Sequence, residues 1–175
     1  MTGCLDAGPA TKLLPALRQR VAGPILYCDD DAIYGPGWAS GFLAARQAHP
    51  GAAIAASSFC VSPLGLTPRA APGPRVAQGF AGVLVNADMF GPLPEAPCDA
   101  CHSVDDIWLS AHLAAARVDI VEAPNLRALV DPFGADVAAL QDAGVPGVSR
   151  KTANLDCAQK LRWQLGVWAP ETGRA

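Results

Sequence analysis

The chain has 175 residues, of which 51% are hydrophobic and 17% are charged, and it carries a formal net charge of −3. This length suits one domain over residues 1–175, and the hydrophobic content excludes a disordered chain. No block of Lys and Arg is present, so we expect no nucleic acid partner. No apolar stretch approaches the roughly 20 residues that span a bilayer, so we expect no integral membrane segment.

The spacing of apolar residues predicts short helices and strands that alternate along the chain. In chain order they are helix 9–20, strand 25–28, helix 38–47, strand 52–61, strand 82–86, helix 104–116, strand 118–121 and helix 156–165. In the first helix the leucines face inward, while Lys12, Arg18 and Arg20 point outward. The run 25–28 is continuously apolar, as in a buried parallel strand. This alternation favours an α/β fold with a mostly parallel sheet flanked by helices.

An acidic triplet, Asp29-Asp30-Asp31, directly follows the first predicted strand, at the sheet edge where ligands bind in α/β folds. In an extended backbone Asp29 and Asp31 point to one side and Asp30 to the other. Three adjacent carboxylates repel each other, and Mg²⁺ or Mn²⁺ bridging Asp29 and Asp31 to a diphosphate would relieve the repulsion. Such a cation stabilises charge on a departing nucleoside diphosphate. The alternative is a solvated acidic turn.

A second acidic pair, Asp105-Asp106, begins the predicted helix 104–116. Helix capping would account for one of these carboxylates, and the other is a candidate general base that takes a proton from an attacking hydroxyl. Between the two acidic centres, residues 78–82 read Gln-Gly-Phe-Ala-Gly. The glycines permit close approach of the backbone to a ligand, and Phe80 offers an aromatic face to a sugar. A metal centre and a base together are what inverting glycosyl transfer to an alcohol requires.

Three segments in this order, ILYCDDDAIYGPGW, QGFAGVLV and VDDIWLSAHLA, resemble glycosyltransferases of the GT-A fold. The likeness is closest to bacterial enzymes of the family 2 type that modify surface polysaccharides. The upstream GPATKLLPAL is similar to the segment before the DxD strand in these enzymes, so the resemblance covers residues 8–122. Family members usually have a longer nucleoside-binding part before the DxD motif, whereas 28 residues precede Asp29 here. The resemblance therefore implies a domain that is partial at its N-terminus.

The resemblance also implies roles for the matched residues. Asp29 and Asp31 would be the metal-binding acids of the DxD motif, with Mn²⁺ or Mg²⁺ as the cofactor. Asp106 would be the catalytic base, supported by Asp105. The implied substrate-binding residues are Asp30, Gly79, Phe80, Ala81, Gly82 and Trp108. For Trp108 the alternative is packing within the core.

The expected partners are a nucleoside-diphosphate sugar as donor and a saccharide or other hydroxyl compound as acceptor. The alternative function is a catalytically impaired domain of the same fold that binds a sugar or a partner. A phosphatase or nucleotidyl hydrolase could use the triplet with Mg²⁺, but no nucleophile motif or GxxxxGK loop is recognisable. Without a recognisable secretory signal, we expect a cytoplasmic location, either free or peripheral to the inner face of the membrane.

The six cysteines lie at positions 4, 28, 60, 98, 101 and 157. Since no signal for export is recognised, we expect reduced and mostly buried thiols. Cys98, Cys101 and His102 match the CxxCH pattern of c-type haem attachment, which would require export to an oxidising compartment. A structural zinc site formed by these three residues with Cys157 is a further alternative. The simplest interpretation is that these side chains bind no metal.

Overall fold

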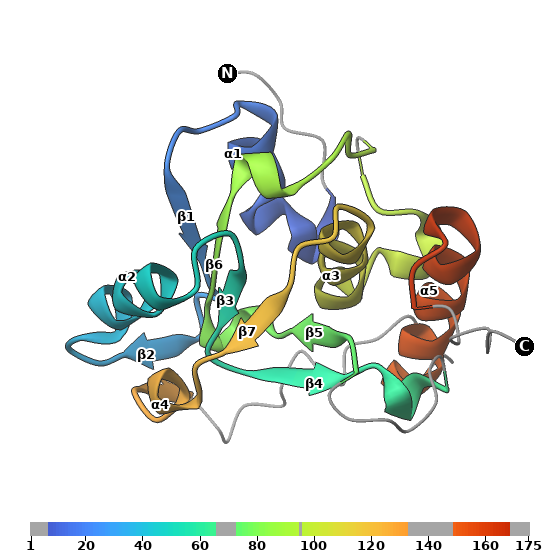
Figure 1. Cartoon of the computed structure of the whole chain (residues 1–175). Helices are drawn as coiled ribbons and strands as arrows, with labels where there is room; N and C mark the ends of the chain where they lie inside the picture. Colours follow the sequence, from blue (N-terminus) through green and yellow to red (C-terminus); the bar gives the residue numbers. More distant parts are fainter. Residues whose placement is uncertain (1–6, 66–72, 95, 133–148, 169–175) are drawn as a thin grey trace, which may run out of the picture.

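A four-stranded sheet with the order β1-β6-β3-β7 lies at the centre of the computed structural model (Figure 1), which describes residues 7–65, 73–94, 96–132 and 149–168. Its strands are β1 (Pro24–Tyr27), β6 (Val83–Asn86), β3 (Ala53–Ala55) and β7 (Ile120–Glu122). β6 is antiparallel to both β1 and β3, and only β3 and β7 are parallel. The α/β class is confirmed, but the predicted mostly parallel sheet is wrong because antiparallel pairing dominates.

Within the described residues, two further sheets have two antiparallel strands each. They pair β2 (Ala32–Tyr34) with β8 (Val130–Pro132), and β4 (Ser58–Cys60) with β5 (Arg75–Ala77). The predicted strand 52–61 is therefore two strands, β3 and β4, which belong to different sheets. β1 is an edge strand in which only Tyr27 is buried, so the prediction of a buried parallel strand at 25–28 is wrong.

Helices cover the sheets and fill the connections between strands. The α-helices are α1 (Leu14–Arg18), α2 (Trp38–Ala48), α3 (Asp105–Ala115), α4 (Pro124–Arg127) and α5 (Arg150–Leu165). The 3-10 helices are η1 (Gly8–Lys12), η2 (Ser62–Leu64), η3 (Gly79–Ala81), η4 (Ala87–Met89) and η5 (Asp99–Cys101). Among the described residues, no helix is both long and apolar enough to cross a membrane.

Both faces of the central sheet are apolar because helices cover both sides. In β6, Val83 and Val85 join the core with α1, α3 and α5, whereas Leu84 joins the core with α2 and α4. β3 repeats this pattern, with Ile54 on the α2 side and its neighbouring alanines on the other. The alternation follows from the two-residue period of a strand. Figure 1 shows the resulting layers, with α2 on one side of the sheet, and α3 and then α5 on the other.

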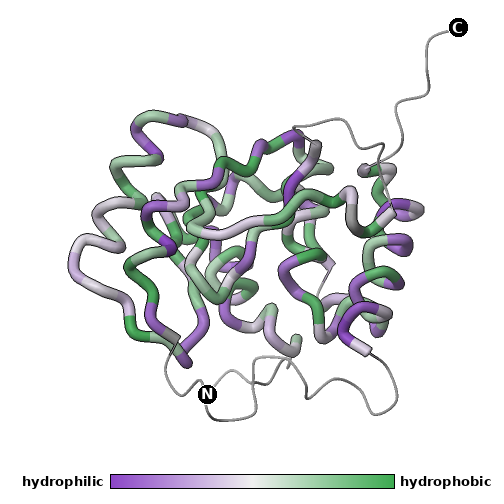
Figure 2. Tube along the Cα trace, turned by 90° about the horizontal axis from the view of Figure 1, so that it is seen from below, coloured by the Kyte–Doolittle hydropathy of each residue, from purple (hydrophilic) through white to green (hydrophobic). Residues whose placement is uncertain are grey.

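The predicted helices differ in how closely they match the structure. α2 and α3 lie within a residue of their predicted limits at each end. The predicted helix 9–20 is divided into η1 and α1 around Leu13, each with a proline in its first turn. α5 begins before its predicted start, because Ser149 caps it by accepting the Thr152 N–H at 3.1 Å. Hydrophobic and hydrophilic residues are interspersed along this helix (Figure 2), and its buried residues are Cys157, Ala158 and Leu161.

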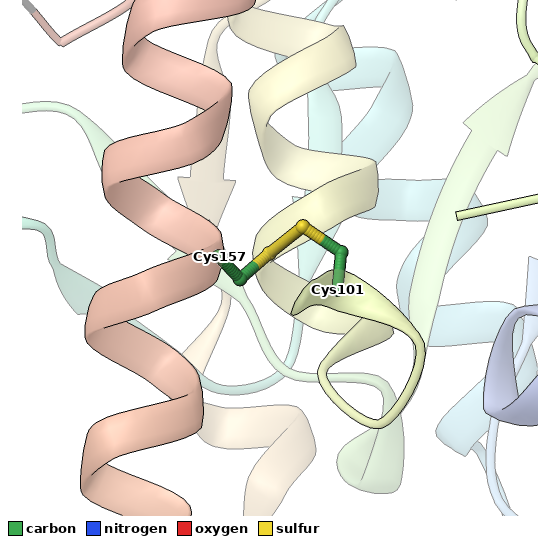
Figure 3. The surroundings of a disulfide bond; sticks show 2 residues. All are labelled: Cys101 and Cys157. Carbon is green, nitrogen blue, oxygen red and sulfur yellow. A yellow bond between two sulfur atoms is a disulfide. The ribbon is translucent and has the colours of Figure 1, made fainter. Parts of the chain in front are cut away.

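A disulfide joins Cys101 at the end of η5 to Cys157 in α5, with a Cα–Cα distance of 4.8 Å (Figure 3). The expectation of reduced thiols is therefore wrong for this pair, because α5 packs directly on η5, a contact that the sequence spacing does not reveal. Neither bonded sulfur supplies a thiolate to zinc or a thioether to haem. The free cysteines of the described residues are Cys28, Cys60 and Cys98, and Cys4 lies outside those residues.

Candidate functional site

Lys12, the last residue of η1, joins the two acidic centres predicted from the sequence. Its Nζ lies 2.6 Å from Asp29 Oδ1 and 3.0 Å from Asp105 Oδ2. The Lys12 side chain is 19% exposed and that of Asp105 is 5% exposed, so this ion pair is largely shielded from water. Lys12 was predicted to point outward and was not among the expected site residues. We refer to Lys12, Asp29, Gly79, Asp105 and Asp106 as the Lys12 site.

The pairing of β1 with β6 explains how the site is assembled. Tyr27 at the end of β1 lies opposite Val83 at the start of β6. Because these strands are antiparallel, the chain leaving β1 toward Asp29 lies beside the chain that enters β6 through η3. η1 packs on α3, and this contact brings Lys12 to the first turn of α3. The antiparallel order that was not predicted is therefore what brings the two acidic centres together.

The Asp105-Asp106 pair begins α3, with the apolar Val104 at the N-cap position. The predicted capping role is therefore wrong, and each carboxylate has another partner. Asp105 pairs with Lys12, and Asp106 Oδ1 accepts the Gly79 backbone N–H at 2.9 Å. Both carboxylates also lie in the first turn of the helix, where the helix dipole favours negative charge.

A side chain at Gly79 would displace the charged groups beside it. A Cβ atom at this position would lie 2.7 Å from Lys12 Nζ and 3.1 Å from Asp106 Oδ1. Glycine thus allows the backbone to approach both charged groups and to donate its N–H to Asp106. The close backbone approach predicted for this loop occurs at Gly79, where the neighbouring groups belong to the protein itself.

The charges of the Lys12 site shift the protonation equilibria of its members. Burial and then the charge of Asp105 raise the pKa of Asp106 from 3.8 to about 7, although Lys12 and the Gly79 N–H act in the opposite direction. Burial by itself lowers the pKa of Lys12, but the surrounding carboxylates outweigh it and raise this pKa above 10.5. Burial, followed by the nearby carboxylates, also raises the pKa of Tyr27. Lys12 is therefore positively charged, and Asp106 exchanges its proton near neutral pH.

The acidic triplet is only partly inside this site. Asp29 is half-buried at the Lys12 ammonium, whereas Asp30 and Asp31 are exposed and lie in a bend between β1 and β2. The extended backbone assumed for the triplet is interrupted by a bend at Asp30 and Asp31. Tyr34 Oη lies 2.7 Å from Asp29 O and 3.0 Å from Phe80 O, so its hydrogen bond links this bend to η3.

The remaining residues of the Gly-Phe-Ala-Gly segment pack against protein groups. Ala81 is buried, and its carbonyl oxygen accepts the Trp38 Nε1–H at 3.1 Å. Gly82 has a φ of +104°, and the ring of Trp38 occupies the position that its Cβ would need. The Phe80 ring lies 5.1 Å from the Arg127 guanidinium, which makes a cation–π contact. Within this segment, only Gly79 contacts the charged groups of the Lys12 site.

Trp108, for which either substrate contact or packing was expected, lies in the core of the structure. Its side chain is 2% exposed and makes an edge-on contact with the His112 ring, with 4.7 Å between the ring centroids. Burial lowers the pKa of His112 to about 4, so this histidine is neutral at physiological pH. The position of Trp108 corresponds to the packing alternative.

The donor atoms near the triplet suit a hard divalent cation. Asp29, Asp30 and Asp31 supply carboxylate oxygens at or near the surface, and Mg²⁺ or Mn²⁺ is commonly held by one or two carboxylates with water and substrate phosphates. Among the described residues, no three His, Cys, Asp or Glu side chains are arranged to hold a metal ion. A cation at Asp29 and Asp31 would therefore need ligands from water and from the phosphates of a substrate.

Comparison with known proteins identified no relative of this chain. No protein-family model, curated protein or solved structure matches the chain.

Proposed function

We propose that this chain is a glycosyltransferase domain that moves a sugar from a nucleoside-diphosphate sugar to a hydroxyl acceptor with inversion. The observation that carries the proposal is the Lys12 bridge, which joins Asp29 of the triplet to Asp105 of the second acidic pair. The motif segments that resemble family 2 enzymes of the GT-A fold therefore contribute side chains to one charged site. A metal-binding turn and a base within one site are what this reaction needs.

In the proposed reaction Asp106 is the base. It takes the proton of the acceptor hydroxyl while the hydroxyl oxygen attacks the anomeric carbon from the side opposite the leaving diphosphate, which inverts the configuration. Its pKa of about 7 supports this role, because a base is most effective when its pKa is near the working pH. The Gly79 N–H fixes one carboxylate oxygen of Asp106, and Asp105 holds Lys12 beside it.

Asp29 and Asp31 would hold Mn²⁺ or Mg²⁺, with Asp30 beside them on the exposed side of the bend. The cation would supply positive charge that stabilises the departing nucleoside diphosphate. Lys12 neutralises part of the negative charge at Asp29 and thereby reduces repulsion between the acidic residues and the donor phosphates. For the whole protein we propose a cytoplasmic location, where nucleoside-diphosphate sugars are used.

One observation favours a second candidate, a domain of the same kind that binds a sugar or a partner without turnover. The Lys12 ammonium already occupies Asp29 Oδ1, so a cation at the triplet has to share Asp29 with a bound positive charge. This competition weakens metal binding. The two candidates differ in a measurable way, because only the transferase needs nucleotide binding that depends on a divalent cation.

Calorimetric titration with uridine diphosphate, with and without Mn²⁺, distinguishes the two candidates. For the transferase we expect binding that requires Mn²⁺ and weakens at least about tenfold, or about 1.4 kcal/mol, in Asp31→Ala. Asp119→Ala is the matched control, because Asp119 is an exposed aspartate outside the site. Binding in this control should equal that of the wild type. No binding at millimolar nucleotide favours the second candidate.

Turnover is measured as release of nucleoside diphosphate from a panel of sugar donors. Asp106→Asn should retain nucleotide binding and lose on the order of 10² to 10⁴ in rate, the usual contribution of a general base. Asp31→Ala should lose both binding and turnover. If both variants turn over as fast as the wild type, the assigned roles are wrong.

A further inference from the structure

Cys98 and Cys101 lie at the two ends of η5, and Cys101 forms the disulfide with Cys157 of α5. Cys101 and Cys157 are fully buried and joined, whereas Cys98 is a free and partly exposed thiol at the N-cap of η5. The Cys101 backbone N–H donates to Cys98 O at 2.7 Å, which closes a tight turn over residues 98–101. Figure 3 shows Cys101 on this turn, facing Cys157 on α5.

The dimensions of this turn are compatible with a disulfide between Cys98 and Cys101. A four-residue turn brings its first and last Cα atoms within about 7 Å. Disulfides form across Cα separations of roughly 4.4 to 6.8 Å, so the turn and a Cys98–Cys101 bond have compatible dimensions. Cys101 therefore has two possible partners, one in its own turn and one in α5.

We propose that Cys98, Cys101 and Cys157 form a thiol–disulfide exchange site that attaches α5 to η5 and releases it. The Cys98 thiol gives its proton to water, and the resulting thiolate attacks Cys101 Sγ. The Cys98–Cys101 bond forms as the Cys101–Cys157 bond breaks, and Cys157 leaves as a thiolate that takes up a proton. The exchange conserves both electrons and protons, so it needs no added oxidant or reductant.

Exchange replaces a link between two helical elements by a link within one turn. The present disulfide joins positions 56 residues apart. At the start of α5, Arg150 Nη1 also donates a hydrogen bond of 3.0 Å to Ser103 O. His102, which directly follows this turn, lies against Gly8 at the start of η1, since a Cβ at Gly8 would lie 2.7 Å from His102 O. After exchange, α5 is held by packing and by Arg150, and the turn before α3 loses its covalent anchor.

Peptide mapping tests the proposal directly. The folded protein is equilibrated in a glutathione buffer, quenched with acid, alkylated and digested with trypsin. Cleavage after Arg75, Arg117, Lys151 and Lys160 separates residues 76–117, which contain Cys98 and Cys101, from residues 152–160, which contain Cys157. The present disulfide links these two peptides, whereas the exchanged form gives an internal disulfide in 76–117 and an alkylated Cys157. We expect both forms in the wild type.

Variants isolate each form. Cys98→Ser should show only the linked peptides, and Cys157→Ser should show only the internal disulfide. Cys60→Ser removes a free thiol of β4 and should match the wild type. Hydrogen exchange should show loss of protection in α5 but not in β6 for Cys157→Ser.

The proposal is overturned if the folded wild type yields no internal disulfide at any glutathione ratio. It is also overturned if Cys98 and Cys101 remain alkylated in folded Cys157→Ser. The wild-type mapping does not depend on the folding of any variant. All of these measurements are covalent or structural, so their outcome is independent of the proposed transferase activity.

Discussion

Asp105 and Asp106 lie inside the structure at the start of α3, whereas Asp30 and Asp31 lie in an exposed bend after β1. Each carboxylate of the inner pair has a defined partner, which is the Lys12 ammonium for Asp105 and the Gly79 N–H for Asp106. The outer pair faces water. Side chains of the same type therefore have opposite surroundings on the two sides of Lys12 and its partner Asp29.

This difference shows how one residue type can serve two kinds of chemistry. Burial penalises the charged form of a carboxylate, so the inner pair is stable only with fixed partners, and for Asp106 burial raises the pKa. In the outer pair, water screens the carboxylates, which keep their lone pairs available to a cation. The structure thus separates a proton-exchanging acid from candidate cation ligands.

Lys12→Met should produce the largest effect, because it removes the cation that compensates a buried Asp105. Removal of one partner from a buried ion pair typically costs about 3 to 5 kcal/mol of unfolding free energy, and we expect about 3 kcal/mol here. Urea denaturation at neutral pH measures it. Lys160→Met is the matched control, since Lys160 is exposed on α5 and its loss should change stability by less than about 0.5 kcal/mol.

The double variant Lys12→Met with Asp105→Asn removes both charges and should recover part of this loss. A recovery of more than about 1 kcal/mol over the sum of the two single effects identifies direct coupling. A cost below about 1 kcal/mol for Lys12→Met alone would show that the inner pair does not depend on this cation.

Several individual helices and strands could be predicted from the sequence, but the pairing of the strands and the packing of the helices could not. Residue periodicity predicts the helices α2 and α3, because a helix with a buried side has apolar residues at helical spacing. It also predicts β6, because a strand buried on both faces is a continuous apolar run. The direction of β1 leaves no such pattern, since an apolar run looks the same in a parallel or an antiparallel sheet. The contact of η5 with α5, and with it the disulfide, also depends on long-range packing.

The candidate site was predictable to a similar extent. Runs of adjacent carboxylates are conspicuous, so both acidic centres could be found from the sequence. Lys12 was assigned to a solvated face because lysines on amphipathic segments usually point outward. Its role follows only from the position of η1 against α3, which no local pattern encodes.

The pH dependence of stability tests the raised pKa of the buried Asp106. Its pKa in the folded state, about 7, lies above its ordinary value of 3.8, so the folded state favours the protonated form. The contribution of Asp106 to stability is therefore complete below about pH 4 and is lost as the pH rises through 7. Asp106→Asn does not titrate, so its stability relative to the wild type should increase between pH 4 and pH 8.

Urea denaturation of both proteins at several pH values measures this difference. The comparison with the wild type cancels the titration of the other groups to first order. A difference that is constant from pH 4 to pH 8 would show that Asp106 is not shifted, and its assignment as the base would lose its support.

Asp31→Asn should have the smallest effect on stability. Asp31 is exposed in the bend, and removing its charge slightly relieves the repulsion within the triplet. We expect a change of less than about 0.5 kcal/mol in the unfolding free energy, the usual range for an exposed position. Asp105→Asn is the matched inner variant and should cost at least about 2 kcal/mol, because the partner of Lys12 becomes neutral. Equal costs for the two variants would mean that Asp31 has a structural partner, and the assignment of Asp31 to cation binding would then lose its physical basis.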